Sequence, residues 1–424
     1  MRPSVPQLNV LALHQMGDPR YWREAVRSLE FMIQDCRPEL NCIVHDCAYP
    51  LPEYLRELDY HLIVMGPTFL CNRYREENLQ RTRENYRFIA QSKACKVALP
   101  QDDYDCSAIL DDWLNDWAVD RIYTVCPDKW HILYPKCNEN REILLGYTGY
   151  VSEEWLESWR RPKPRKARTL DVSYRASKLP ANFGSLGALK YRIADRFLEA
   201  LGKGSRLKKD ISTRFEDMIP GKQWHDFMND SKCCLTTPSG SSLLDPHNKI
   251  RKCVESFVLH NPTAEFEEIE AHCFPELDRQ QVFSAISPRN IEAALAETVQ
   301  LATPGNYSDL MEPETDYVRL EEDCSNIKDV LKTIGDSKKC EAIADCCKEK
   351  ILAQPRLRRA NIVGEIVEFG AKIASERGIP EPDQRKVDKA LKKYQQDKNS
   401  NFQRISPVKK IRYFFRKILK RKKS

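Results

Sequence analysis

Short apolar runs alternate with segments of helical periodicity along most of the chain. In the first part of the sequence, the apolar runs lie at 8–14, 42–44, 60–65, 96–99, 122–125 and 143–147. Between them, segments such as 22–33 and 109–117 repeat apolar residues at helical spacing. Strands that alternate with helices predict a parallel sheet covered on both faces, and therefore an α/β fold.

A charged, proline-containing stretch, RRPKPRKAR at 160–168, interrupts this alternation. A second strand–helix series follows it, and 424 residues are enough for two domains. The pattern after about residue 350 is helical. We therefore expect an N-terminal Rossmann-like domain (1–159), a linker (160–168), a second α/β domain (169–350), a helical extension (351–403) and a basic tail (404–424).

The net charge of +6 is unevenly distributed. Because residues 404–424 contain ten Lys or Arg and no acid, the first 403 residues sum to −4. A mildly acidic body is not expected to bind nucleic acid, so the basic property belongs to the tail alone.

The sixteen cysteines are irregularly spaced and include no C-x-x-C motif. The N-terminal MRPSVPQLNV lacks the apolar core of a secretory signal. We interpret the cysteines as reduced, buried thiols of a cytosolic protein, and not as a zinc site or a disulfide framework. No apolar run approaches the ~20 residues that cross a bilayer.

The stretch from 282 to 320 predicts a strand, a turn, a helix, a loop and a strand. An apolar run ends at Ser287-Pro288, and proline is a good first residue of a helix. We expect Glu292 on the first turn of that helix. A carboxylate there can bind ribose hydroxyls, and free helix N–H groups can hold a phosphate, so the stretch suits a nucleoside diphosphate.

Short words in this stretch resemble the donor-binding half of group 1-like, GT-B-type glycosyltransferases of bacterial cell-envelope polysaccharide biosynthesis. They are SPR (287–289), EAA (292–294), PGNYS (304–308), YVRL (317–320) and DCSN (323–326). The resemblance implies two Rossmann-like domains that face a cleft, with a nucleotide-sugar donor between them. The alternative is an ordinary strand–helix–strand unit of another α/β protein.

The resemblance also covers DVSYR (171–175) and a glycine-containing loop that leads to Lys190. Cations at the carboxyl end of a strand can neutralise a diphosphate leaving group, which makes Arg175 and Lys190 catalytic candidates. For Lys190 the alternative is a solvated surface lysine. The donor contacts that the resemblance implies are Ser239, Gly240, Ser241, Ser287, Arg289 and Glu292.

In the first domain, LPQDDY (99–104) and TGYV (148–151) resemble words of the same family. Asp102 and Asp103 come directly after a strand. One of them is a candidate general base for an acceptor hydroxyl, or orients the acceptor. The alternative is that the pair caps the next helix.

One position departs from the family. The commonest retaining GT-B enzymes carry two glutamates eight positions apart; Glu292 matches the second, but the first position is Ser284. Inverting and retaining chemistry therefore both remain open. No D-x-D word stands at a strand end in the donor half, so we expect no metal site and no cofactor beyond the nucleotide-sugar co-substrate.

The tail has an apolar stripe among its cations. At helical spacing, the stripe consists of Ile411, Phe414, Phe415, Ile418 and Leu419. This pattern is typical of an interfacial helix on anionic lipid, and the alternative is a disordered basic tail that contacts nucleic acid.

Together these features predict a cytoplasmic, metal-independent glycosyltransferase on the inner face of the plasma membrane. It would move a sugar from a nucleotide-activated donor to a lipid-linked envelope glycan. The alternatives are a non-catalytic GT-B-like scaffold at the membrane and a nucleotide-sugar-modifying enzyme such as an epimerase.

Overall fold

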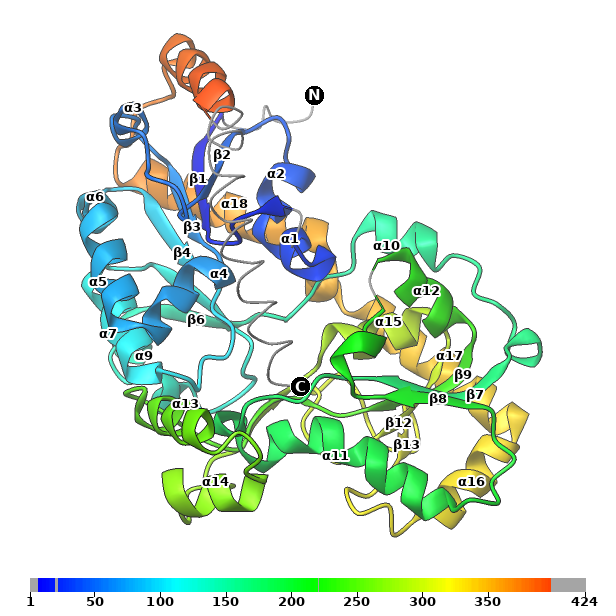
Figure 1. Cartoon of the computed structure of the whole chain (residues 1–424). Coiled ribbons are helices and arrows are strands. Elements are labelled where there is room, and N and C mark those ends of the chain that lie inside the picture. The colour runs from blue at the N-terminus through cyan, green and yellow to red at the C-terminus, as the bar shows by residue number, and fades with distance from the viewer. Residues whose placement is uncertain (1–6, 20–21, 220, 398–424) are drawn as a thin grey trace.

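The computed structural model describes residues 7–19, 22–219 and 221–397, which form two α/β lobes side by side (Figure 1). Each lobe is built on its own parallel sheet. The two-domain α/β prediction is therefore confirmed. Within the described ranges, we find no helix with the length and apolar character needed to span a bilayer.

The N-terminal sheet is six-stranded, with the order β2-β1-β3-β4-β5-β6, and all its pairs are parallel. Every residue of the first five strands is buried, which explains why they read as continuous apolar runs. The strands are β1 (Asn9–His14), β2 (Asn41–Asp46), β3 (Leu62–Met65), β4 (Cys95–Ala98), β5 (Arg121–Thr124) and β6 (Glu142–Leu145).

Helices connect these strands and cover both faces of the sheet (Figure 1). They are α1 (Glu24–Glu30), α2 (Met32–Cys36), α3 (Glu53–Arg56), α4 (Pro67–Leu70), α5 (Glu76–Asn85), α6 (Arg87–Gln91), α7 (Ser107–Asp116), α8 (Trp130–Leu133) and α9 (Cys137–Asn140), with the 3₁₀ turn η2 (Cys71–Tyr74). Helix α10 (Glu153–Ser158) follows the last strand and lies on the side of the C-terminal lobe (Figure 1).

The C-terminal sheet has the order β13-β12-β9-β7-β8, again with parallel pairs throughout. Its strands are β7 (Leu170–Arg175), β8 (Lys209–Ser212), β9 (Ser231–Thr236), β12 (Val299–Ala302) and β13 (Val318–Arg319). Its helices are α11 (Gly184–Leu201), α12 (Lys222–Asn229), α13 (Lys249–His260), α14 (Phe266–Cys273), α15 (Pro288–Leu295), α16 (Ile327–Gly335) and α17 (Ser337–Ala353).

The strand predicted at 282–286 is present but lies outside the parallel sheet. As β11 (Phe283–Ala285) it pairs antiparallel with β10 (Ser239–Ser241) in a separate two-stranded ribbon. Gly240 permits this pairing, because a Cβ there would lie 1.9 Å from the carbonyl oxygen of Phe283. The ribbon feeds directly into α15.

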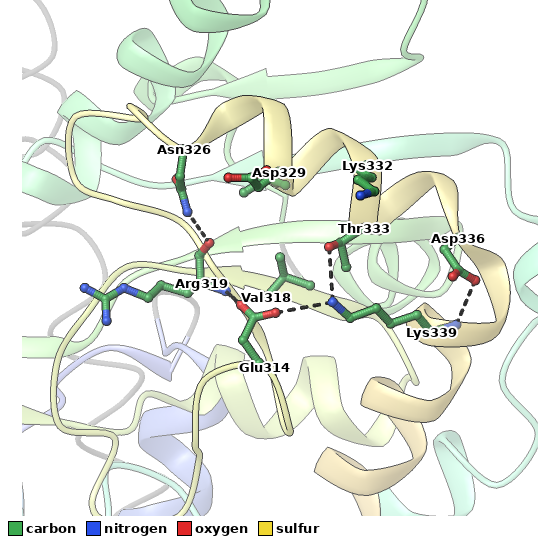
Figure 2. A pocket seen from close by; sticks show the side chains of 10 residues that line it. Glu314, Val318, Arg319, Asn326, Asp329, Lys332, Thr333, Asp336 and Lys339 are labelled. Atoms are coloured by element: carbon green, nitrogen blue, oxygen red, sulfur yellow. Dashed lines mark hydrogen bonds and ion pairs between the residues drawn. The ribbon is translucent and has the colours of Figure 1, made fainter.

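A hollow of about 440 Å³ lies between β13 and α16, on the side of the C-terminal lobe away from the N-terminal lobe (Figures 1 and 2). Two of its charged residues pair with each other, since Lys339 lies 3.5 Å from Glu314. The Lys339 amide also donates to the Asp336 side chain, at 3.1 Å. None of the site residues predicted from the sequence lines this hollow.

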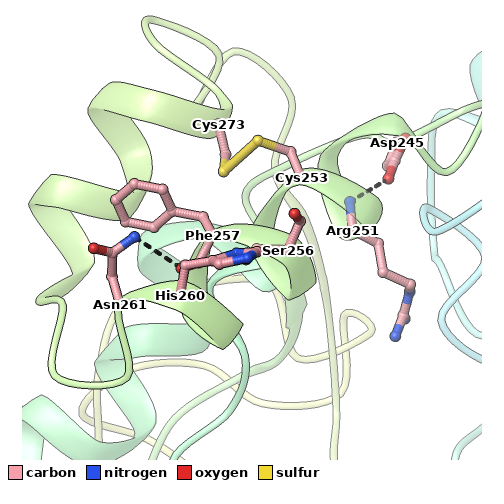
Figure 3. The surroundings of a disulfide bond; sticks show 8 residues. All are labelled: Asp245, Arg251, Cys253, Ser256, Phe257, His260, Asn261 and Cys273. Atoms are coloured by element: carbon pink, nitrogen blue, oxygen red, sulfur yellow. Dashed lines mark hydrogen bonds between the residues drawn. A yellow bond between two sulfur atoms is a disulfide. The ribbon is translucent and has the colours of Figure 1, made fainter.

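The prediction that all cysteines are reduced is wrong for one pair. Cys253 of α13 and Cys273 of α14 form a disulfide, with their Cα atoms 5.5 Å apart (Figure 3). The two helices pack as a hairpin and bring residues 20 positions apart into bonding distance. Irregular spacing in the sequence gave no sign of this pairing.

After α17 the chain returns to the N-terminal lobe. Helix α18 (Arg359–Glu376) packs against β3, β4 and α2 (Figure 1). A further helical segment from 384 to 397 docks beside β2, where the Tyr394 hydroxyl lies 2.9 Å from Nδ1 of His45. The predicted membrane stripe, Ile411, Phe414, Phe415, Ile418 and Leu419, lies outside the described residues.

Candidate functional site

Loops at the carboxyl ends of strands from both lobes meet at the contact between the lobes. The amide of Asp245 donates to the carbonyl of Tyr104 at 2.9 Å. The hydroxyl of Thr148 donates to the carbonyl of Ile286 at 3.0 Å. Ligands of open α/β sheets bind at this end of the strands, so the contact is the place to look for a site.

Two cations of the C-terminal lobe come together here. Lys190 belongs to α11 and Arg289 to α15, and both are partly buried. Burial and the Arg289 charge lower the pKa of Lys190 from 10.5 to about 8. In the part of the chain that the structure describes, neither side chain has an ion-pair partner.

The Arg289 guanidinium is held by aromatic faces. It lies 5.2 Å from the ring centroid of Tyr174 and 5.6 Å from that of Trp224. Its buried Nε has no hydrogen-bond partner within the described ranges. An arginine that is positioned by rings, and not by a carboxylate, keeps its donors for an anion.

Glu292 lies on α15 one turn beyond Arg289. Because the helix starts at Pro288, Glu292 is on its second turn, and the expectation of a first-turn position is wrong. The Trp224 indole N–H donates to Oε2 of Glu292 at 2.8 Å. Burial raises the pKa of the Glu292 carboxyl, against the lowering effects of this hydrogen bond and of the Arg289 charge.

The N-terminus of α15 is capped by side chains of its own sequence. The Ser287 hydroxyl and amide both donate to Oδ1 of Asn290, at 2.6 and 2.9 Å. Ser287 therefore stabilises the helix terminus in the empty protein. Its hydroxyl is not free to bind a donor without breaking this pair.

The Ser/Gly turn at 239–241 forms strand β10. Ser241 is fully buried, and its hydroxyl donates to the Leu243 carbonyl at 3.0 Å. Gly240 is required by the pairing with β11. Ser239 is partly exposed and is the residue of this turn that can reach a ligand.

Arg175 is committed to its own lobe. Its Nη2 binds Oδ1 of Asp210 at 2.7 Å, and its Nε donates to the Asp217 carbonyl at 2.9 Å. The guanidinium also lies 4.7 Å from the Phe227 ring centroid. The structure thus brings Lys190 together with Arg289, and not with Arg175.

The adjacent carboxylates of the N-terminal lobe point in different directions. Asp102 has a left-handed backbone, φ 53°, and accepts a hydrogen bond from the Tyr104 hydroxyl at 2.6 Å. Its charge raises the pKa of Lys190, against the larger lowering effects of burial and of the Arg289 charge. Asp103 is fully buried and accepts hydrogen bonds from the Thr124 and Tyr134 hydroxyls.

Burial raises the pKa of Asp103, whose hydrogen-bond partners all belong to the N-terminal lobe. Asp103 therefore holds its loop in place. The role of Asp102 as a base or an acceptor contact stays a prediction.

Arg73, which sequence reasoning missed, fixes the loop that carries Asp102. It is buried, and its guanidinium donates to the carbonyls of Gln101, Asp102 and Asp105 at 2.7, 2.9 and 3.0 Å. An arginine in a polar helical stretch gives no sequence signal for such a role.

We call Asp102, Lys190, Trp224, Arg289 and Glu292 the interdomain site. It combines two unpaired cations with one carboxylate from the same lobe and another from the opposite lobe. Cations of this kind bind a diphosphate, and a buried carboxylate can accept hydrogen bonds from hydroxyls. Within the described ranges, we find no cluster of three or more His, Cys, Asp or Glu that could hold a metal ion.

No family model and no curated protein matches the sequence. Solved structures do match. An α-glucosyltransferase in complex with UDP and a 13-mer DNA containing an HMU base shares 9% identity, over 87% of this chain and 100% of that chain, with a TM-score of 0.50. Anabaena HepE in complex with UDP-glucose shares 13% identity, over 86% and 100%, with a TM-score of 0.49.

A Rickettsia africae glycosyltransferase also matches, at 8% identity over 87% of this chain and 98% of that chain, with a TM-score of 0.44. At these identities the likeness concerns the fold alone. The α-glucosyltransferase match, taken with the two facing parallel sheets, confirms the predicted fold: the chain has the GT-B architecture with a helical C-terminal region.

Proposed function

We propose that this chain is a glycosyltransferase that takes its sugar from a nucleoside diphosphate donor bound at the interdomain site. Lys190 and Arg289 would hold the diphosphate, and Glu292 would accept hydrogen bonds from the ribose hydroxyls. Asp102, on the opposite lobe, would orient or deprotonate the acceptor hydroxyl.

The observation that carries this proposal is the pair of unpaired cations. Arg289 and Lys190 are close enough for one to depress the pKa of the other, and neither has an ion-pair partner in the described part of the chain. Like charges in a partly buried place destabilise the protein by themselves. A bound diphosphate would remove this repulsion. The two cations would in turn stabilise the negative charge that develops on the diphosphate as it leaves the sugar.

The acceptor we propose is a lipid-linked cell-envelope glycan, reached from the cytoplasmic face of the plasma membrane. Two sequence features support this acceptor. The motifs at 99–104 and 148–151 resemble those of cell-envelope glycosyltransferases, and residues 404–424 combine an apolar stripe with basic residues. Deleting residues 404–424 should then weaken sedimentation with anionic vesicles and leave the melting temperature unchanged. Equal sedimentation of the two proteins would contradict the role of the tail.

Calorimetric titration with nucleotide sugars tests the donor site. UDP-glucose is the first probe, because the α-glucosyltransferase of the same fold was solved with UDP. Binding should be weakened by Lys190→Met and by Arg289→Met. The matched control is Lys178→Met, which removes an exposed lysine from the loop after β7.

Three outcomes separate the candidates. Binding followed by transfer or slow hydrolysis of the donor supports a glycosyltransferase. Binding without turnover in the presence of envelope lipid extracts favours a scaffold, and conversion of the donor to an isomeric nucleotide sugar favours an epimerase. If no nucleotide sugar binds, or if the three variants bind equally well, the proposal is wrong.

A further inference from the structure

The edge strand β8 and the loops on either side of it form a basic surface with exposed apolar residues. We call it the β8 surface. Strand β8 is the outer strand of the C-terminal sheet, with β7 as its neighbour. The cations of this surface, all exposed, are Lys203, Arg206, Lys208, Lys209 and Lys222.

These cations are not neutralised by the acids around them. Asp210 is paired with Arg175 at 2.7 Å, and Asp217 with Arg214 at 2.8 Å. Among the described residues, the five cations have no ion-pair partner, while Glu216 is the acid of the surface that remains exposed and unpaired. The surface therefore carries a net positive charge, in contrast to the acidic balance of the first 403 residues as a whole.

Apolar side chains stand out from the same surface. Phe215 is 74% exposed and lies in the 3₁₀ turn η5 (Phe215–Asp217), which follows β8. Met218, three residues later, is 42% exposed. A large aromatic ring left in water gives up the free energy of burial, so its position suggests that something covers it.

The β8 surface adjoins the interdomain site. The turn with Phe215 lies at the carboxyl end of β8, the same end of the sheet at which α15 and the Asp102 loop meet. Arg175, the last residue of β7, holds this turn to the sheet, because its Nε donates to the carbonyl of Asp217 at 2.9 Å.

We propose that the β8 surface binds the anionic headgroup layer of a lipid bilayer, with Phe215 and Met218 entering the interface. Exposed aromatic and aliphatic residues on the same edge of a lobe as unpaired cations are the combination that an anionic bilayer surface recognises. Four of the cations lie before β8 or at its first residue, and Phe215 and Met218 follow its last residue, so a flat bilayer surface along this edge can reach both. A nucleic acid would use the cations but would leave Met218 without a role. The proposal deepens the proposed function, since it presents the site to a lipid-linked acceptor, and it does not depend on residues 404–424.

Vesicle sedimentation of the full chain, without nucleotide, tests this surface. The vesicles contain phosphatidylglycerol and phosphatidylcholine in equal parts, with pure phosphatidylcholine as the neutral comparison. The charge variant is Lys203→Glu/Lys208→Glu/Lys209→Glu, and its matched control is Lys328→Glu/Lys332→Glu/Lys338→Glu on α16 and α17, where the three lysines are equally exposed. The apolar variant is Phe215→Ser, and its matched control is Leu259→Ser on α13, where Leu259 is 76% exposed.

We expect the charge variant to bind anionic vesicles roughly a hundred-fold or more weakly than the wild type, and Phe215→Ser roughly ten-fold more weakly. Both controls should bind like the wild type. If each β8 variant sediments as its control does, the proposal is overturned. It is also overturned if the charge variant loses binding to single-stranded RNA while wild-type protein ignores the vesicles.

The test is independent of the donor site. Calorimetric binding of UDP-glucose by the β8 variants reports whether the interdomain site is intact. If vesicle binding depends on Phe215 but the protein binds no nucleotide sugar, the proposal of a membrane-binding surface stands and the proposed glycosyltransferase function is refuted. If the protein turns over the donor but its vesicle binding does not change in the Phe215 and lysine variants, the glycosyltransferase function stands and the membrane-binding surface is refuted.

Discussion

Replacing Lys190 by methionine should stabilise the empty protein while damaging its binding site. The pKa of Lys190 is lowered from 10.5 to about 8, so the folded state disfavours the charged amine. Below pH 8 the folded and unfolded chains are both protonated, and this cost is fully present. It disappears as the pH rises toward 10.5, where the amine is neutral in both states. The shift corresponds to about 3 kcal/mol at most, because Lys190 is partly exposed.

Thermal or urea unfolding at pH 7 measures the first half of this prediction. Lys190→Met should unfold at a higher denaturant concentration than the wild type, and the difference should shrink toward pH 10. Calorimetry at pH 7 measures the second half: UDP-glucose should bind roughly ten- to a hundred-fold more weakly, since a hydrogen bond to a charged group is lost.

The pH dependence adds a third measurement. Binding of UDP-glucose by the wild type should weaken as the pH rises from 7 to 9, because Lys190 loses its proton near pH 8. Lys190→Arg stays charged in this range and should show no such loss. The reasoning is refuted if the Lys190→Met protein is less stable than the wild type and binds UDP-glucose with unchanged affinity. Lys190 would then be an ordinary surface lysine without a role in binding.

The remaining predictions concern the other members of the interdomain site and its charge. Glu292→Gln should raise stability at pH 8, where the buried carboxylate is costly to ionise, and lower UDP affinity roughly ten- to a hundred-fold; lower stability with unchanged affinity would contradict it. Asp102→Asn should slow donor turnover by roughly a hundred-fold or more and leave UDP-glucose affinity nearly unchanged in calorimetry, whereas equal turnover would remove Asp102 from the reaction. Donor turnover should survive EDTA, because Lys190 and Arg289 meet the diphosphate charge; a strict requirement for Mg²⁺ or Mn²⁺ would show otherwise.

The strands of this fold could be predicted because burial on both faces leaves a clear trace in the sequence. All six residues of β1 are buried, and the run at 8–14 locates it within a residue. In the β10–β11 ribbon, β11 was predicted from the apolar run that ends at Ser287, but β10 left no such trace. Its Ser/Gly residues resemble a phosphate-binding turn, and only the approach of Gly240 to the Phe283 carbonyl shows that they serve backbone pairing.

The site could be predicted by region but not by residue. Arg175 and Arg289 both follow strands, and no local pattern distinguishes them. The partner of Arg175 is Asp210, 35 positions away on the neighbouring strand, so its neutralisation depends on the pairing of β7 with β8. Asp102 and Asp103 likewise differ in their hydrogen-bond partners, which the sequence does not display.

Two charged clusters at the lobe contact show why the interdomain site is best read as a ligand site. In the first, Arg251 of α13 is ion-paired with the buried Asp105 across the lobes, and its guanidinium lies 4.3 Å from the Tyr74 ring centroid. That cluster is complete: each charge meets an opposite charge, as the cost of burial requires.

In the second cluster, Lys190 faces Arg289, and among the described residues the direct partner of Glu292 is an indole N–H. The same chain, at the same contact, thus joins the charges of one cluster in a direct ion pair and leaves the cations of the other without one among the described residues. A fold that can place Asp105 against Arg251 has no structural need for the second arrangement. The repulsion between Lys190 and Arg289 reduces the stability of the ligand-free protein. An anion with hydroxyl groups beside its charge would relieve this repulsion and could also bind Glu292, which is the chemical reason for proposing a nucleoside diphosphate.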